Sequence, residues 1–203
     1  MGYLNQHKGL YLGELVGSFL RDFYANISAE LTSIAITVLI IDAIYQKRDI
    51  EREKRDLMLQ MGSPDNAFAT EAVRRLRAQG WLEDGTLRHA YLCRADLRGV
   101  YLSKADLSKA DLSEANLSGA NLSEANLSNA DLYWTNLSNV DLSGANLSKA
   151  NLFRANLRGA DLHRANLLEA KVAAKQLAHA KILGGVTMPD GTEKLEKGDI
   201  RKE

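Results

Sequence analysis

The chain has 203 residues, a length that suits one domain or two small ones. Its 26 Lys and Arg residues equal its 26 Asp and Glu residues in number, so the net charge at pH 7 is zero. This balance argues against a general nucleic-acid binder, which carries a basic excess, and against a strongly acidic mimic of nucleic acid. The single cysteine, Cys93, cannot form an internal disulfide, so the sequence does not point to an oxidising compartment.

Residues 1–22 predict an amphipathic helix. Leucine, valine and phenylalanine recur at helical spacing from Leu12 to Phe23. A helix of this kind either lies on a membrane surface or packs against the segment that follows it.

Residues 23–46 predict a transmembrane helix. Their centre is a run of eleven residues without charge, whose large apolar members are Leu31, Ile34, Ile36, Val38, Leu39, Ile40 and Ile41. A membrane span needs about 20 residues. The whole stretch reaches that length if Glu30 and Asp42 lie near the two boundaries of the hydrocarbon, where a carboxylate costs less than at the centre. The alternative is a helix buried in a soluble helical domain or in an oligomer.

Residues 47–62 predict a charged helical stalk. Five basic residues occur between Lys47 and Arg55, whereas only Lys8 and Arg21 precede the apolar stretch. This bias favours an orientation with the segment after the span in the cytoplasm and the N-terminus outside. The mixed charges predict a solvated helix with internal ion pairs. A cytoplasmic chain without a membrane span is the alternative.

Residues 63–82 predict a capping helix. Ser63 is a candidate N-cap and Pro64 a candidate first helical residue. The helix is expected to run to about Gln79 and to end at Gly80. Its predicted apolar face and the apolar residues after it are Phe68, Ala72, Val73, Leu76, Trp81 and Leu82. We expect this face to cover the open end of the structure that follows.

From Leu87 to Leu167 a leucine occupies every fifth position. The position two residues earlier is nearly always alanine, with Val100, Thr135 and Val140 as substitutes, and the position between them is mostly Asp or Asn. A fixed period sustained over this length predicts a repeat architecture.

A period of five fits neither regular helix nor flat strand. On an α-helix five residues advance about 500°, so successive leucines would point to every side. On a strand an odd period sends alternate leucines to opposite faces. A chain that turns a corner every five residues brings all the leucines and alanines inward and leaves the other three positions facing water.

A second period of twenty predicts a square coil of four such units. Gly99, Gly119 and Gly159 stand at multiples of twenty, and Tyr133 and Phe153 are also twenty apart. Segments such as 105–109 and 125–129 match the pattern A-(D/N)-L-x-x, which closely resembles the pentapeptide-repeat family. The layout also resembles that of membrane-anchored bacterial members.

The resemblance implies an all-β solenoid, a right-handed quadrilateral β-helix, over residues 83–187. An α-helical N-terminal region precedes the solenoid. After it, residues 188–203 are expected to form a Pro-Asp-Gly turn and a charged tail.

The chain offers no set of residues typical of an active site. The three histidines near or within the repeats fall on different sides of the expected coil, so they predict no metal site. No glycine-rich phosphate loop is present, and the Asp, Asn and Ser residues follow the repeat pattern. We therefore expect no catalytic residue, no cofactor, no metal and no small-molecule substrate.

One side of the expected coil departs from the polar pattern. Its outward pairs are Tyr133–Trp134 and, one coil later, Phe153–Arg154. Exposed aromatic residues beside an arginine are the composition of a protein-interaction hot spot. The partner would be another protein or a second copy of this chain. The alternative is that a terminal element or the N-terminal helix covers the group.

The sequence therefore predicts a non-enzymatic, membrane-tethered protein-binding scaffold whose repeats face the cytoplasm. Membrane lipid is an expected partner and nucleic acid is not. The alternative is a soluble oligomeric repeat protein that mimics nucleic acid or modulates a topoisomerase. Mimicry needs an acidic surface, whereas residues 87–187 hold 12 basic and 9 acidic side chains.

Overall fold

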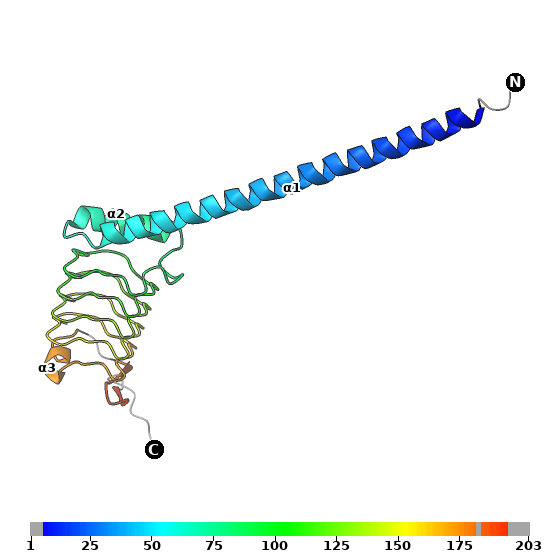
Figure 1. The fold of residues 1–203 in the computed structure, drawn as a ribbon. Coiled ribbons are helices and arrows are strands. Elements are labelled where there is room, and N and C mark those ends of the chain that lie inside the picture. Colours follow the sequence, from blue (N-terminus) through cyan, green and yellow to red (C-terminus); the bar gives the residue numbers. More distant parts are fainter. Residues whose placement is uncertain (1–5, 182–183, 195–203) are drawn as a thin grey trace, which may run out of the picture. The chain divides into compact units, whose positions relative to one another are not determined.

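The structure of the chain is a computed structural model that describes residues 6–181 and 184–194 (Figure 1). Its elements in chain order are α1 (Gln6–Met61), α2 (Asn66–Ala78), α3 (Ala174–Leu177), β1 (Val186–Thr187) and β2 (Glu193–Lys194). The chain divides into two compact units, Met1–Glu51 and Arg52–Glu203.

The first unit is the greater part of α1, and the two segments that the sequence separates at residue 22 form one continuous helix in it. Its apolar side chains are exposed: Leu31 by 61%, Ile36 by 52% and Leu39 by 68%. Among the described residues, α1 is long and apolar enough to cross a membrane, judged by length and composition. The predicted span, residues 23–46 with its apolar centre from Leu31 to Ile41, lies within it.

The hydroxyl groups in this apolar stretch bond back to the helix itself. Thr32 Oγ1 donates to the Ser28 carbonyl at 2.7 Å, and Thr37 Oγ1 donates to the Ser33 carbonyl at 2.8 Å. Such bonds satisfy a hydroxyl within its own helix, as apolar surroundings require.

The last turns of α1 belong to the second unit and differ from the expected solvated stalk. Leu57 is 1% exposed and Met61 is fully buried. Four residues separate them, so they lie on one face of the helix. This face joins the hydrophobic core of the repeats, and Glu53 forms an ion pair with Arg75 of α2. The end of α1 is therefore part of the cap.

Helix α2 begins two residues later than Ser63–Pro64 predicted. The N-cap is Asp65, whose side chain accepts a hydrogen bond from the Ala67 N–H at 2.8 Å. Ser63 instead accepts from the Asp65 N–H at 3.0 Å, in the turn before the helix. The helix ends at the C-cap Gln79, and Gly80 follows with φ +72°.

The buried face of α2 is Ala69, Ala72, Val73 and Leu76. Phe68 does not belong to it, because this side chain is 61% exposed. One residue is a rotation of about 100° on a helix, which places Phe68 on the flank. The Asn66 side-chain amide donates to the carbonyls of Asp96 and Arg98, which ties the start of α2 to the first coil.

The repeats form coils of twenty residues, which confirms the square-coil prediction. Parallel β-bridges join residues twenty apart, for example Asp111 with Asp131 and Asn126 with Asn146. The leucines from Leu87 to Leu167 at every fifth position are at most 2% exposed, and the alanine column is also buried. Each coil therefore fills its own interior with one leucine and one small residue per side.

The polar positions satisfy the backbone at the corners. The side chain of Asn126 accepts from the Ser128 N–H at 3.2 Å and donates to Asp106 Oδ1, one coil earlier, at 3.0 Å. The fifth residue of each unit has a left-handed backbone, as in Glu114 with φ +58°. The Asp and Asn residues are thus structural parts of the repeat.

The far end of the repeats is closed by α3 and a short hairpin (Figure 1). Strands β1 and β2 pair antiparallel around Pro189-Asp190-Gly191, where Gly191 has φ +84°. Thr187 bridges Asn166, a spacing of 21 instead of 20, so the last coil contains one additional residue. Glu193 and Lys194 of the expected charged tail are part of the hairpin, and residues 195–203 lie outside the described residues.

An ion pair links α1 to the loop after α2. Lys54 Nζ lies 2.7 Å from Asp84 Oδ2, and the same ammonium lies 5.3 Å from the centre of the Trp81 ring. Burial acts to raise the pKa of Asp84, but the hydrogen bonds from Lys54 and Thr86 outweigh it and lower the pKa. The pair therefore stabilises the fold above the ordinary pKa of an aspartate, and this contribution is lost as the pH falls through the lowered value.

We expect Asp84→Asn to lower the free energy of unfolding by about 1 kcal/mol at neutral pH, because the pair is partly exposed. The deficit relative to the wild type should begin to shrink below about pH 4, where the carboxylate of the unfolded wild type takes up a proton, and should vanish as the pH falls through the lowered pKa of the folded state. Urea unfolding followed by tryptophan fluorescence at several pH values measures this deficit. The control is Glu83→Gln, which neutralises the exposed carboxylate next to Asp84 in the sequence. A deficit that does not change with pH would contradict the assignment.

Candidate functional site

The structure brings the four predicted site residues together. The rings of Tyr133 and Phe153 are stacked, with centroids 6.1 Å apart and an interplanar angle of 14°. The Trp134 ring centroid lies 6.2 Å from that of Tyr133. The Arg154 guanidinium lies 5.8 Å from the Trp134 ring and 5.5 Å from the Phe153 ring. Tyr133, Trp134, Phe153 and Arg154 are called the aromatic cluster below.

The repeat geometry places these side chains. Tyr133 and Phe153 occupy equivalent positions on successive coils, which lie about 4.8 Å apart as neighbouring strands do. The Asp131 side chain accepts from the Tyr133 N–H at 3.0 Å, and the Asn151 amide donates to the same Asp131 oxygen at 2.9 Å. The Trp134 N–H donates to the Phe153 carbonyl at 3.1 Å. The backbone under the cluster is therefore held on both coils.

The backbone conformation at position 134 is unfavourable for a residue with a side chain as large as that of Trp134. Its φ is +56°, in the left-handed region where a bulky L-residue costs roughly 1–2 kcal/mol. Its side chain is 57% exposed and that of Phe153 is 54% exposed, so burial in the folded chain does not offset this cost. The fifth residue of every unit has this backbone, so the strain belongs to the repeat, and what sets this position apart is its large exposed aromatic side chain, which is typical of interaction surfaces.

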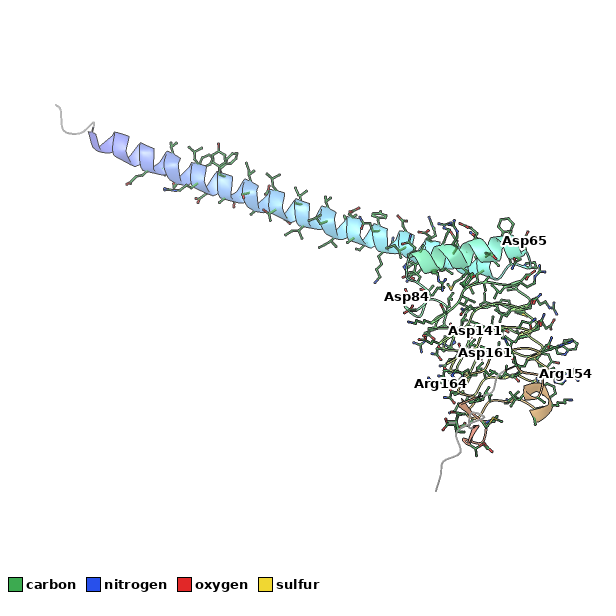
Figure 2. The ribbon with its side chains drawn as sticks, turned by 180° about the vertical axis from the view of Figure 1, so that it is seen from behind. Asp65, Asp84, Asp141, Arg154, Asp161 and Arg164 are labelled. Atoms are coloured by element: carbon green, nitrogen blue, oxygen red, sulfur yellow. The ribbon has the colours of Figure 1, made fainter. Side chains whose placement is uncertain are left out.

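Helix α3 lies next to Arg154 of the aromatic cluster (Figure 2), and it leaves the Trp134 and Phe153 side chains more than half exposed. The Gln176 amide donates to the carbonyls of Leu152 and Ala155, both at 2.8 Å, which fixes α3 to the coil before it. A hollow lies between the two, lined by Trp134, Phe153, Arg154, Ala155, Ala173, Lys175 and Gln176. A partner side chain placed here would meet aromatic rings, aliphatic carbon and two cations.

Other exposed aromatic residues lie elsewhere on the repeats. Tyr101 is 62% exposed, on the opposite side of the coil from the aromatic cluster, and Arg77 lies 5.6 Å from its ring. Tyr91 is 76% exposed. The sequence analysis did not single them out, although both stand in the column where the repeat has Asp or Asn, and this departure was a usable signal.

No group of three His, Cys, Asp or Glu side chains that could hold a metal ion occurs among the residues that the structure describes. Cys93 is a free, partly exposed thiol. The members of the candidate membrane span, from Leu31 to Ile41, are on the exposed surface of α1 and take no part in the aromatic cluster.

Comparison with protein families matches the family described as pentapeptide repeats, in eight copies over residues 82–113, 105–144 and 130–168. The match supports a right-handed β-helix solenoid, and the parallel bridges between residues twenty apart agree with it. Comparison with curated proteins gives no match.

Several solved structures are similar to the repeat segment. HetL, involved in heterocyst differentiation regulation in the cyanobacterium Nostoc sp. strain PCC 7120, is 35% identical, with a TM-score of 0.42, 53% of this chain and 56% of that chain covered. Rfr23 from the cyanobacterium Cyanothece 51142 is 40% identical, with a TM-score of 0.42, and the match covers 42% of this chain and 58% of that chain. QnrB1, a plasmid-mediated fluoroquinolone resistance protein, is 18% identical, with a TM-score of 0.29, and the match covers 54% of this chain and 57% of that chain. The chain thus spans a little over half the length of these proteins.

Proposed function

We propose that this chain, whose residues 82–168 match the pentapeptide-repeat family, is a non-enzymatic scaffold, tethered to a membrane by α1, that binds another protein through the aromatic cluster. The observation that carries the proposal is the cluster itself: the Tyr133 and Phe153 rings are stacked, and the Trp134 and Phe153 side chains remain more than half exposed. Aromatic and arginine side chains supply most of the binding energy in protein interfaces.

The tether is supported by the first unit. Its apolar side chains have no core to enter within that unit, and its threonine hydroxyls are satisfied by the helix itself. The basic residues between Lys47 and Arg55 would hold the end of the span at the cytoplasmic surface. In this arrangement the repeats face the cytoplasm.

The charge of the repeats argues against nucleic-acid mimicry. Residues 87–187 hold 12 basic and 9 acidic side chains, and several acidic ones are paired with cations on the preceding coil, such as Glu114 with Arg94 at 2.9 Å. A mimic of the phosphate backbone needs a dense, regular row of negative charge.

Fractionation of the full-length chain tests the tether. We expect it to stay in the membrane pellet through washes with high salt and alkaline carbonate, and to be released by detergent. Release by carbonate alone would remove the membrane span from the proposal and make α1 a candidate oligomerisation helix.

Site-specific photo-crosslinking tests the binding face. A benzoyl-phenylalanine at position 153 should yield a cross-linked product with another protein in cells. The same residue at position 101, an exposed aromatic site on the opposite side of the coil, is the matched control. Equal products from both positions, or none from position 153, would contradict a partner-binding role for the aromatic cluster.

A further inference from the structure

Positive charge gathers around α3, beside the aromatic cluster. The hollow next to Trp134 includes Arg154 and Lys175 in its lining, and a second hollow across α3 includes Arg158, Lys175 and His179. Figure 2 shows Arg154 next to α3. The linings of the two hollows contain no acidic side chain.

The cations around α3 lack the carboxylate partners that cations have elsewhere on the repeats. On other outward columns a cation meets a carboxylate one coil later, as in Lys104 with Glu124 at 3.9 Å and Lys149 with Glu169 at 3.7 Å. The residue one coil after Arg154 is Ala174, which has no charge to offer.

The three cations Arg154, Arg158 and Lys175 form no ion pair with any residue in the part of the chain that the structure describes. The acidic group beneath the cluster, Asp131, is occupied by the Tyr133 N–H and the Asn151 amide. Arg154, Arg158 and Lys175 outnumber this one carboxylate, so the face next to the cluster carries an excess of positive charge.

We propose that the partner engages this face through an acidic peptide segment that carries one aromatic or aliphatic anchor residue. The inference rests on the proposed function and specifies the chemistry of its partner. The anchor enters the hollow beside Trp134 and packs on the rings. Carboxylates on either side of it meet Arg154, Arg158 and Lys175, and the planar guanidinium groups offer paired donors to a carboxylate.

A peptide fits this face better than a nucleic acid does. Three cations around one short helix do not make the extended basic stripe that tracks a phosphate backbone. The anchor residue of a peptide also accounts for the exposed rings, for which a phosphate backbone offers no partner.

Selection from a displayed library of random peptides tests the inference, with the full chain in detergent micelles as bait. We expect enriched peptides to combine several Asp or Glu residues with one aromatic or aliphatic residue. These peptides should bind the double variant Arg154→Glu/Lys175→Glu at least about 10-fold more weakly, because two favourable charge contacts become repulsive. The same variant should enrich peptides that are poor in Asp and Glu.

The matched control is Lys109→Glu/Arg164→Glu, which reverses two exposed cations on other sides of the coil. It should leave the affinity for the enriched peptides unchanged.

Enriched peptides that are neutral or basic, or an equal loss of affinity in the control, would overturn the acidic-partner inference and leave the proposed function standing. Displacement of the enriched peptides by a poly-thymidine oligonucleotide at lower concentration than an acidic peptide would overturn it in favour of nucleic acid. If no peptide is enriched, the inference fails, and the cross-link at position 153 decides separately whether the proposed function holds.

Discussion

Replacing Leu127 with alanine is expected to lower the free energy of unfolding of the repeats by about 3 kcal/mol, within the range for a leucine truncated in a rigid core. Leu127 is fully buried in the middle of the stack. Its neighbours belong to backbone ladders that run through every coil, so they cannot collapse into the space that the side chain leaves. Each coil contacts only the coils next to it, and a central defect therefore weakens two interfaces at once.

Urea unfolding followed by the fluorescence of Trp81 and Trp134 measures this loss, because both tryptophans lie in the second unit. The control is Leu59→Ala in α1, where the side chain is 77% exposed and the expected change is less than about 0.5 kcal/mol. Similar losses for the two variants would show that the leucine column does not carry the stability of the repeats.

The double substitution Trp134→Ala/Phe153→Ala is expected to weaken partner binding by about 100-fold or more. Truncation of a hot-spot aromatic residue costs at least about 2 kcal/mol, and these two residues line the same hollow and contact the same anchor. Stability should change little, because both side chains are more than half exposed. Titration of the full chain in detergent with a peptide enriched on the wild type, or with the protein cross-linked at position 153, gives the affinity.

Trp134→Gly separates binding from stability. Glycine adopts the φ of +56° without strain, so this variant should be more stable than the wild type by about 0.5–1 kcal/mol while it binds the partner poorly. Tyr101→Ala on the opposite side of the coil is the control and should leave binding unchanged. A Trp134→Gly variant that retains full affinity would remove Trp134 from the binding surface.

The membership of the aromatic cluster followed from the twenty-residue register alone. Once the coil has four sides of five residues, Tyr133 and Phe153 must occupy equivalent positions on successive coils, and the residue after each must lie beside it. The stacking of the two rings and the position of Arg154 over them depend on side-chain rotamers. The border made by α3 depends on the Gln176 side chain, which bonds to carbonyls 21 and 24 residues away.

The repeats were determined by the sequence because their structure is local and recurrent. A leucine at every fifth position and a small residue two places earlier leave only one arrangement that buries both. The Asp or Asn between them satisfies the backbone within its own unit, as Asn126 does for Ser128.

The ends of the stack were decided by tertiary contacts between distant segments. In the sequence, Leu57 and Met61 are two apolar residues in a charged segment. They are buried because they pack against the core at the open first coil. The N-cap at Asp65 and the additional residue in the last coil likewise depend on how the ends meet the coils. The Arg154 guanidinium has no carboxylate partner because the residue one coil later, at the equivalent position, is Ala174. Residues 154 and 174 are neighbours only in the three-dimensional structure, so the missing ion pair depends on the register of the coils.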